Sequence, residues 1–98
     1  MTDFLVVSGI SLNTINQLKK NENLLSDLYD NKDEFINITN YLRMIGIKNI
    51  EEVLIYKPEL FLESKDNLIY SLSQFDLPTI VNMINEDCTN IDLVYEVD

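Results

Sequence analysis

The side chains best suited to chemistry in this sequence are carboxylates, and three pairs of them are adjacent: Asp33–Glu34, Glu51–Glu52 and Glu86–Asp87. Paired carboxylates can act as a general acid and base, or bind a hard cation such as calcium. Neighbouring residues of a helix, however, point about 100° apart and do not converge on one ligand. Each pair also falls near the predicted end of a helix, so we expect solvated or capping roles and no metal site.

Other catalytic side-chain types are scarce. The chain has no His and one Cys, Cys88, which excludes His-based triads, His-containing zinc sites and internal disulfides. A nucleophilic Cys88 would need an electropositive setting that lowers its pKa, but its neighbours Glu86, Asp87 and Asp92 raise it. We therefore expect no catalytic residue, no cofactor and no enzymatic activity.

The charge is strongly negative and unevenly distributed. Seventeen acids against seven bases give a net charge of −10, and no basic residue follows Lys65. The acids of this last third are Asp66, Asp76, Glu86, Asp87, Asp92, Glu96 and Asp98. Such a surface either keeps a protein in solution or attracts a basic partner, and it repels phosphate backbones. The charge therefore favours a protein partner with a basic surface over nucleic acid.

Length and composition favour one helical domain. The 98 residues suffice for a single core, and only two Gly and two Pro are available for the many reversals of a β-sandwich or barrel. The opening stretch contains Asp3 and lacks the basic start of a signal peptide. No run approaches the roughly 20 apolar residues of a membrane span. We expect a cytoplasmic protein without membrane contact.

The apolar pattern recurs three times when the chain is aligned on Gly9, Gly46 and Asp76. Four residues before these anchors stand Leu5, Leu42 and Leu72. Each copy reads as a helix, a reversal at the anchor and a second helix. This pattern predicts an all-α fold, a small solenoid of about three stacked helix-turn-helix repeats with about six or seven short helices. The copies span approximately residues 3–28, 33–63 and 64–98, and residues 30–34 are predicted to form a loop followed by a helix start.

The second copy has the clearest helix signals. Its first helix carries a stripe at helical spacing, formed by Phe35, Ile38, Leu42 and Ile45. Gly46 then suits a left-handed helix cap. The second helix is predicted to begin at Asn49, with Glu52 in capping-box position, and to end before Pro58. Its inner face would be Ile50, Val53 and Leu54.

The outer copies follow the same scheme. In the third, Ser64 is predicted to cap a helix with an inner stripe of Leu68, Leu72 and Phe75. Pro78 suits the first turn of the next helix, whose inward residues would be Ile80, Met83 and Ile84. In the first copy, Ser11 is predicted to cap a helix with Leu12, Ile15 and Leu18 inside.

Several of these positions also carry a family resemblance. They are the run Leu42-Arg43-Met44-Ile45-Gly46-Ile47, then Ile50, Val53 and Leu54, the run Lys57-Pro58-Glu59-Leu60-Phe61-Leu62, and Ser64, Leu68, Leu72 and Leu77. This pattern resembles the repeat of the mitochondrial transcription termination factor (mTERF) family. The resemblance implies two α-helices followed by a short 3₁₀ turn, stacked into a curved solenoid. The 3₁₀ turn would then lie at Pro58-Glu59-Leu60-Phe61.

The resemblance also implies an alternative function, nucleic-acid binding in gene expression through a basic groove. The contacts available for it are Lys19, Lys20, Lys32, Arg43, Lys48 and Lys57. These bases are few for a protein that must neutralise phosphates. The segment from Asn40 to Val53 is similar to helix-hairpin-helix modules, but the Gly-rich hairpin that would hold a phosphate is missing after Pro58.

A few apolar residues lie off the predicted inner stripes, namely Ile36, Met44 and Ile55. They belong either to a second apolar face between stacked repeats or to a groove for a partner. We predict a non-catalytic protein-interaction or regulatory module that presents an acidic surface to a basic, nucleic-acid-binding partner. Its candidate partner-binding residues are Ile36, Met44, Glu51, Glu52, Ile55, Glu86, Asp87 and Asp92.

Overall fold

The computed structural model describes residues 2–95, which form seven α-helices and two 3₁₀ helices and contain no strand. The helices are α1 (Asp3–Val7), α2 (Leu12–Lys19), α3 (Glu22–Asp30), α4 (Lys32–Met44), α5 (Ile50–Tyr56), η1 (Pro58–Leu62), α6 (Lys65–Leu72), α7 (Leu77–Glu86) and η2 (Cys88–Leu93). The predicted all-α class is therefore confirmed. Among these helices, none combines the length and the apolar character that crossing a bilayer requires.

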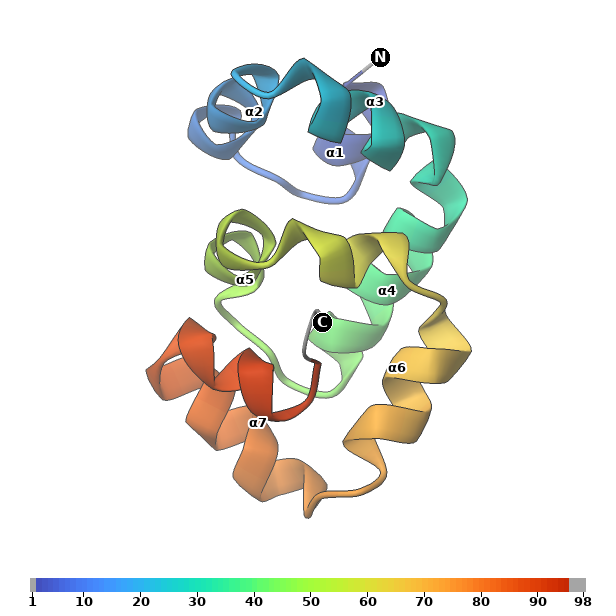
Figure 1. Ribbon diagram of the computed structural model, residues 1–98. Helices are drawn as coiled ribbons and strands as arrows, with labels where there is room; N and C mark the ends of the chain where they lie inside the picture. Colours follow the sequence, from blue (N-terminus) through green and yellow to red (C-terminus); the bar gives the residue numbers. More distant parts are fainter. Residues whose placement is uncertain (1, 96–98) are drawn as a thin grey trace.

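The helices are arranged in three tiers along an axis of 36 Å (Figure 1). One end holds α1, α2 and α3, the middle holds α4, α5 and η1, and the other end holds α6, α7 and η2. Along one side, α5 lies between α2 and η2 and contacts both. Apolar side chains from all three tiers form one core.

The core follows the predicted stripes over most of the chain. Phe35, Ile38 and Leu42 on α4 are buried, as are Ile50, Val53 and Leu54 on α5. Aromatic rings continue this core across two tiers. Phe35 packs edge-to-face on Phe4 of α1, with ring centroids 5.3 Å apart, and lies 5.3 Å from the ring of Phe61 in η1.

The helix boundaries depend on a few capping residues. The Ser64 hydroxyl accepts a hydrogen bond from the Asn67 amide (3.1 Å), and Ser11 caps α2 in the same way through Thr14. Gly46 has φ +104° and is the left-handed cap predicted from the sequence, and Gly9 has φ +80°. At these two turns the amides of Ile10 and Ile47 donate to the carbonyls of Leu5 and Leu42, which is the wide hydrogen bond of a Schellman cap. Both glycine turns therefore have one geometry.

The third anchor, Asp76, adopts a different turn. Its φ of −68° is ordinary, and it precedes α7 as the N-cap residue, with Pro78 in the first turn as predicted. Because α6 already ends at Leu72, Phe75 lies in the turn and is 38% exposed, so its predicted place in the inner stripe is wrong. Leu12 is likewise 69% exposed, because as the first residue of α2 it lies outside the face formed by Thr14, Ile15 and Leu18.

Two further predictions are corrected by the structure. Residues 30–34 do contain the predicted helix start, at Lys32, but the predicted loop is wrong, since α3 ends at Asp30 and Asn31 alone lies between the two helices. Asn49 precedes α5, but its side chain makes no capping hydrogen bond. Its Nδ2 donates instead to the carbonyl oxygen of Ile84 in α7 (2.8 Å), so a contact between tiers replaces the predicted capping box.

Side chains also join the tiers through backbone groups at helix starts and turns. Glu51 Oε1 on α5 accepts from the Ser11 amide (2.8 Å), and Glu34 on α4 accepts from the Lys65 amide (2.9 Å). Asn85 on α7 accepts from the Lys48 amide (2.8 Å) and donates to the Gly46 carbonyl (3.0 Å). Each tier is thereby fixed to the next at a defined position.

Candidate functional site

The outward face of α5 is the part of the predicted site that the structure brings together. Since Ile50, Val53 and Leu54 face the core, the residues one position away on the helix face outward. The outward residues are Glu51, Glu52, Ile55 and Tyr56. Ile55 is 41% exposed, as expected for an apolar residue off the inner stripe.

These residues line a groove that crosses from α2 over α5 to η2. Its volume is about 430 Å³. The lining residues are Thr14 and Gln17 of α2, Glu51, Glu52, Ile55 and Tyr56 of α5, and Cys88 of η2. We call this site the α2–α5–η2 groove.

The two glutamates of the groove differ in their contacts. Hydrogen bonds from Ser11 and Thr14 lower the pKa of Glu51, and the Ser11 hydroxyl lies 2.6 Å from its Oε1. Arg43 is near enough to lower that pKa further. Glu52 is exposed and has no hydrogen-bond or ion-pair partner among residues 2–95. The groove therefore has one carboxylate held in place and one that is available.

Cys88 contributes an apolar, half-buried thiol. Its pKa is raised first by burial and then by the charges of Asp87 and Glu52. Asp87 is itself ionised, because hydrogen bonds from the amide and hydroxyl of Thr89 lower its pKa. The thiol is thus protonated at neutral pH and lies between negative charges, a setting unsuited to a nucleophile.

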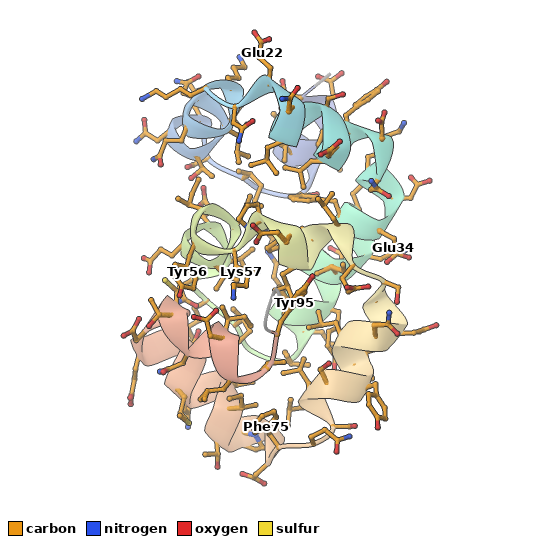
Figure 2. The ribbon with its side chains drawn as sticks, viewed as in Figure 1. Glu22, Glu34, Tyr56, Lys57, Phe75 and Tyr95 are labelled. Carbon is orange, nitrogen blue, oxygen red and sulfur yellow. The ribbon has the colours of Figure 1, made fainter. Side chains whose placement is uncertain are left out.

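The edge of the groove near η2 is fixed by Asp92. Its carboxylate accepts hydrogen bonds from the Tyr56 hydroxyl and from the Lys57 ammonium, which also donates to the Tyr95 carbonyl (3.2 Å). Figure 2 shows Tyr56 and Lys57 at the end of α5 nearest the η2 ribbon. Lys57 and Tyr56 lower the pKa of Asp92. Asp92, a candidate partner-binding residue, therefore stabilises a contact within the chain.

The other candidate partner-binding residues lie elsewhere. Met44, 74% exposed, ends α4, and Ile36 packs against the core from the same helix. Glu86 is exposed at the end of α7, and Asp87 follows it beside Cys88. The structure therefore joins Glu51, Glu52 and Ile55 in one groove but not Ile36, Met44 or Glu86. Helix periodicity places Tyr56, four residues after Glu52, on the same face and could have identified it. It could not identify Thr14, Gln17 or Cys88, because they belong to α2 and η2.

The candidate nucleic-acid contacts lie on several elements. Lys19 and Lys20 are at the end of α2, Lys32 begins α4 with its ammonium 4.5 Å from the Tyr29 ring centre, and Lys48 lies in the α4–α5 turn. The Arg43 guanidinium covers Gly9, and Lys57 is paired with Asp92. Three of the six bases, Lys32, Arg43 and Lys57, thus contact other parts of the chain through their charged ends.

Two smaller hollows also lie on the described surface. One of about 250 Å³ lies between η1 and α6, and one of about 170 Å³ lies beside Phe75 and Leu93. Residues 2–95 contain no group of three or more His, Cys, Asp or Glu side chains that could hold a metal ion. Comparison of the chain with protein-family models, with curated proteins and with solved structures finds no match in any of the three.

Proposed function

We propose that this chain is a non-catalytic protein-interaction module, a small solenoid of three helical repeats similar to those of the mTERF family. Its role would be to present an acidic surface to a basic partner protein, including the basic surface of a nucleic-acid-binding protein. Two kinds of observation support the proposal, one from the turns and links between helices and one from the distribution of charge.

The repeat is supported by features that recur with the sequence pattern. Gly9 and Gly46 form the same capped turn. A short 3₁₀ helix follows α5 and another follows α7, as the repeat pattern expects. The amides two residues after the glycines, those of Ser11 and Lys48, each donate to a side chain of the next tier. Recurring contacts between neighbouring units are typical of stacked repeats.

The observation that carries the function is the unopposed charge after Lys65. Residues 66–95 contain five acids and no base, and Asp92 is the one acid of this segment with a basic partner among the described residues. Glu96 and Asp98 lie outside the described residues. Charged surfaces of one sign steer and select partners of the opposite sign.

The test measures binding of fluorescent peptides by anisotropy over a range of salt concentrations. A Lys-rich peptide should bind, and a peptide of equal length with Gln in place of Lys should not. The double variant Asp66→Asn/Glu86→Gln removes two exposed charges that have no partner among residues 2–95. It should weaken binding roughly three- to fivefold and reduce the salt dependence.

Two results would overturn the proposal. The first is no binding of the Lys-rich peptide at low salt. The second is equal affinity of the double variant and the wild type. Tight binding of duplex DNA at moderate salt would favour the alternative function, in which Lys19, Lys20 and Lys48 contact phosphates.

A further inference from the structure

We propose that the α2–α5–η2 groove is the docking site for an apolar side chain on a Lys- or Arg-rich segment of a partner protein. This inference rests on the proposed function, because it names the place and the chemistry by which a basic partner is bound. It follows from the apolar floor of the groove, the charges on its rim and the fixed position of its walls.

The floor can receive an aliphatic or aromatic side chain. The residues Ile55 and Tyr56 are each about two-fifths exposed, at 41% and 42%. The Cys88 thiol is uncharged, and Thr14 is buried with its hydroxyl beside Ser11. Covering such apolar surface releases water and favours association.

The rim selects for positive charge next to that side chain. Glu51 and Glu52 lie on the α5 side and Asp87 precedes Cys88 on the η2 side, whereas no Lys or Arg lines the groove. Lys57, the nearest base in sequence, is turned to Asp92. An acidic peptide, a nucleic acid or an anionic membrane would be repelled there, and a basic segment would be attracted.

The walls of the groove are already in place without a ligand. The Glu51–Ser11 hydrogen bonds fix α2 to α5, and the contacts of Asp92 with Tyr56 and Lys57 fix η2 to α5. A preformed site loses little conformational entropy on binding. The groove can therefore bind a short segment without rearrangement of its three elements.

The first test compares two labelled peptides, one with a leucine flanked by lysines and one with alanine in place of the leucine. The leucine peptide should bind about tenfold more tightly. Ile55→Ala should reduce this preference. Val7→Ala, which truncates a β-branched residue that is 77% exposed on α1, should leave it unchanged.

The second test locates the peptide and its charges. Glu52→Gln should weaken binding and flatten its salt dependence, whereas Glu22→Gln, which removes an equal charge from the first turn of α3 far from the groove, should have a smaller effect (Figure 2).

Cys88 is the only cysteine in the chain. Saturating leucine peptide should therefore slow alkylation of this single thiol several-fold.

The outcomes separate the inference from the proposed function. Equal binding of both peptides, or unchanged alkylation of Cys88 at saturation, overturns the groove as the docking site but leaves binding of basic segments elsewhere on the acidic surface. Failure of both peptides to bind overturns the proposed function and the inference together. Equal losses in Glu52→Gln and Glu22→Gln also overturn the groove, because only the net charge would then matter.

Discussion

At the scale of single residues, Asp92 is the acid whose ionisation the fold uses most directly. Its carboxylate contacts Lys57, whose side chain is only 13% exposed, and the Tyr56 hydroxyl. These contacts lower the pKa of Asp92 below its usual value of about 3.9. The folded protein therefore binds a proton at Asp92 less readily than the unfolded chain does. The resulting stability is present above the unfolded pKa and is lost as the pH falls through the folded pKa.

We predict that Asp92→Asn lowers the free energy of unfolding at neutral pH, because it removes the charge that pairs with Lys57. The difference from wild type should shrink as the pH falls from about 4, where the unfolded chain begins to bind the proton, through the lowered pKa of Asp92 in the folded protein. Urea unfolding followed by circular dichroism at several pH values measures both effects. In a Lys57→Met background the same substitution should cost less, and a difference that is independent of pH would contradict the assignment.

Substitutions of the two glycines test the geometry of their turns, also at the level of single residues. Gly9→Ala and Gly46→Ala should each cost about 1–2 kcal/mol, because an L-residue at positive φ brings its Cβ against the backbone. At Gly46 the nearest neighbouring atom to a new Cβ is Val81 Cγ1 at 3.5 Å, an ordinary contact, so the cost there comes from the backbone. At Gly9 the new Cβ would lie 2.9 Å from Arg43 Nη2, which can move aside.

Thermal unfolding of these variants gives the measurement. Ser73→Ala is the control, because Ser73 lies in the turn after α6 with an ordinary φ of −65°. This substitution should lower the free energy of unfolding less than either glycine substitution does. If Gly46→Ala is as stable as the wild type, a side chain at this position does not strain the turn, and the prediction is wrong.

At the scale of helices, the links between tiers decide how the elements are placed. Asn85 is half-buried on α7 and makes two hydrogen bonds to the backbone of the α4–α5 turn. We predict that Asn85→Ala costs about 1–3 kcal/mol, because it leaves the Lys48 amide and the Gly46 carbonyl without their partner.

Asn82→Ala on the same helix provides the matched control, since Asn82 is exposed and has no hydrogen-bond partner among residues 2–95. It should change the free energy of unfolding by a few tenths of a kcal/mol, as surface substitutions usually do. Equal losses for the two variants, measured by urea unfolding, would mean that the link contributes nothing beyond helix propensity.

The difference between contacts within one turn and contacts between tiers explains which features could be predicted from the sequence. The capping hydrogen bonds of Ser11 and Ser64 and the positive φ of Gly46 belong to their own turns, so local pattern sufficed to identify these residues as caps. Asn49 has an equally good local pattern but bonds to Ile84 in another tier. Capping rules cannot detect such a tertiary partner. The prediction for Phe75 fails for a different reason: α6 ends at Leu72, its last buried residue, so the apolar spacing continues past the end of the helix.

In the candidate site, too, the local features could be predicted and the contacts between elements could not. The outward positions Glu51, Glu52 and Ile55 follow from helix periodicity, which fixes what a helix presents on each face. Their neighbour Thr14 precedes Glu51 by 37 residues, and Cys88 follows Glu52 by 36 residues. Only the packing of three elements brings these side chains together. A single sequence therefore gives one wall of the groove and not the opposite one.

At the scale of the whole molecule, repulsion among carboxylates opposes folding. The net charge is −10, and Lys57–Asp92 is the one ion pair within residues 2–95. Raising the salt concentration from about 0.01 M to about 0.15 M shortens the Debye length from about 30 Å to about 8 Å. The molecule measures 36 by 25 by 23 Å, so charges on opposite sides interact at the lower concentration only.

We therefore predict that the midpoint of thermal unfolding rises with sodium chloride over this range, because screening relieves more repulsion than attraction. Differential scanning calorimetry at constant pH checks the direction. Replacing Glu86 with Gln should reduce the rise, since it removes one repelling charge. A midpoint that falls with salt would mean that attractive pairs dominate the surface.

The contact between Phe4 and Phe35 has a consequence for the order in which the protein opens. α1 has five residues, too few to persist as an isolated helix, and it is held by the burial of Phe4 and Leu5. We therefore expect its amide protons to be protected from exchange with deuterium only while these two side chains stay packed in the core. Without the Phe4 ring the segment before Gly9 would fray first and leave the remaining tiers closed.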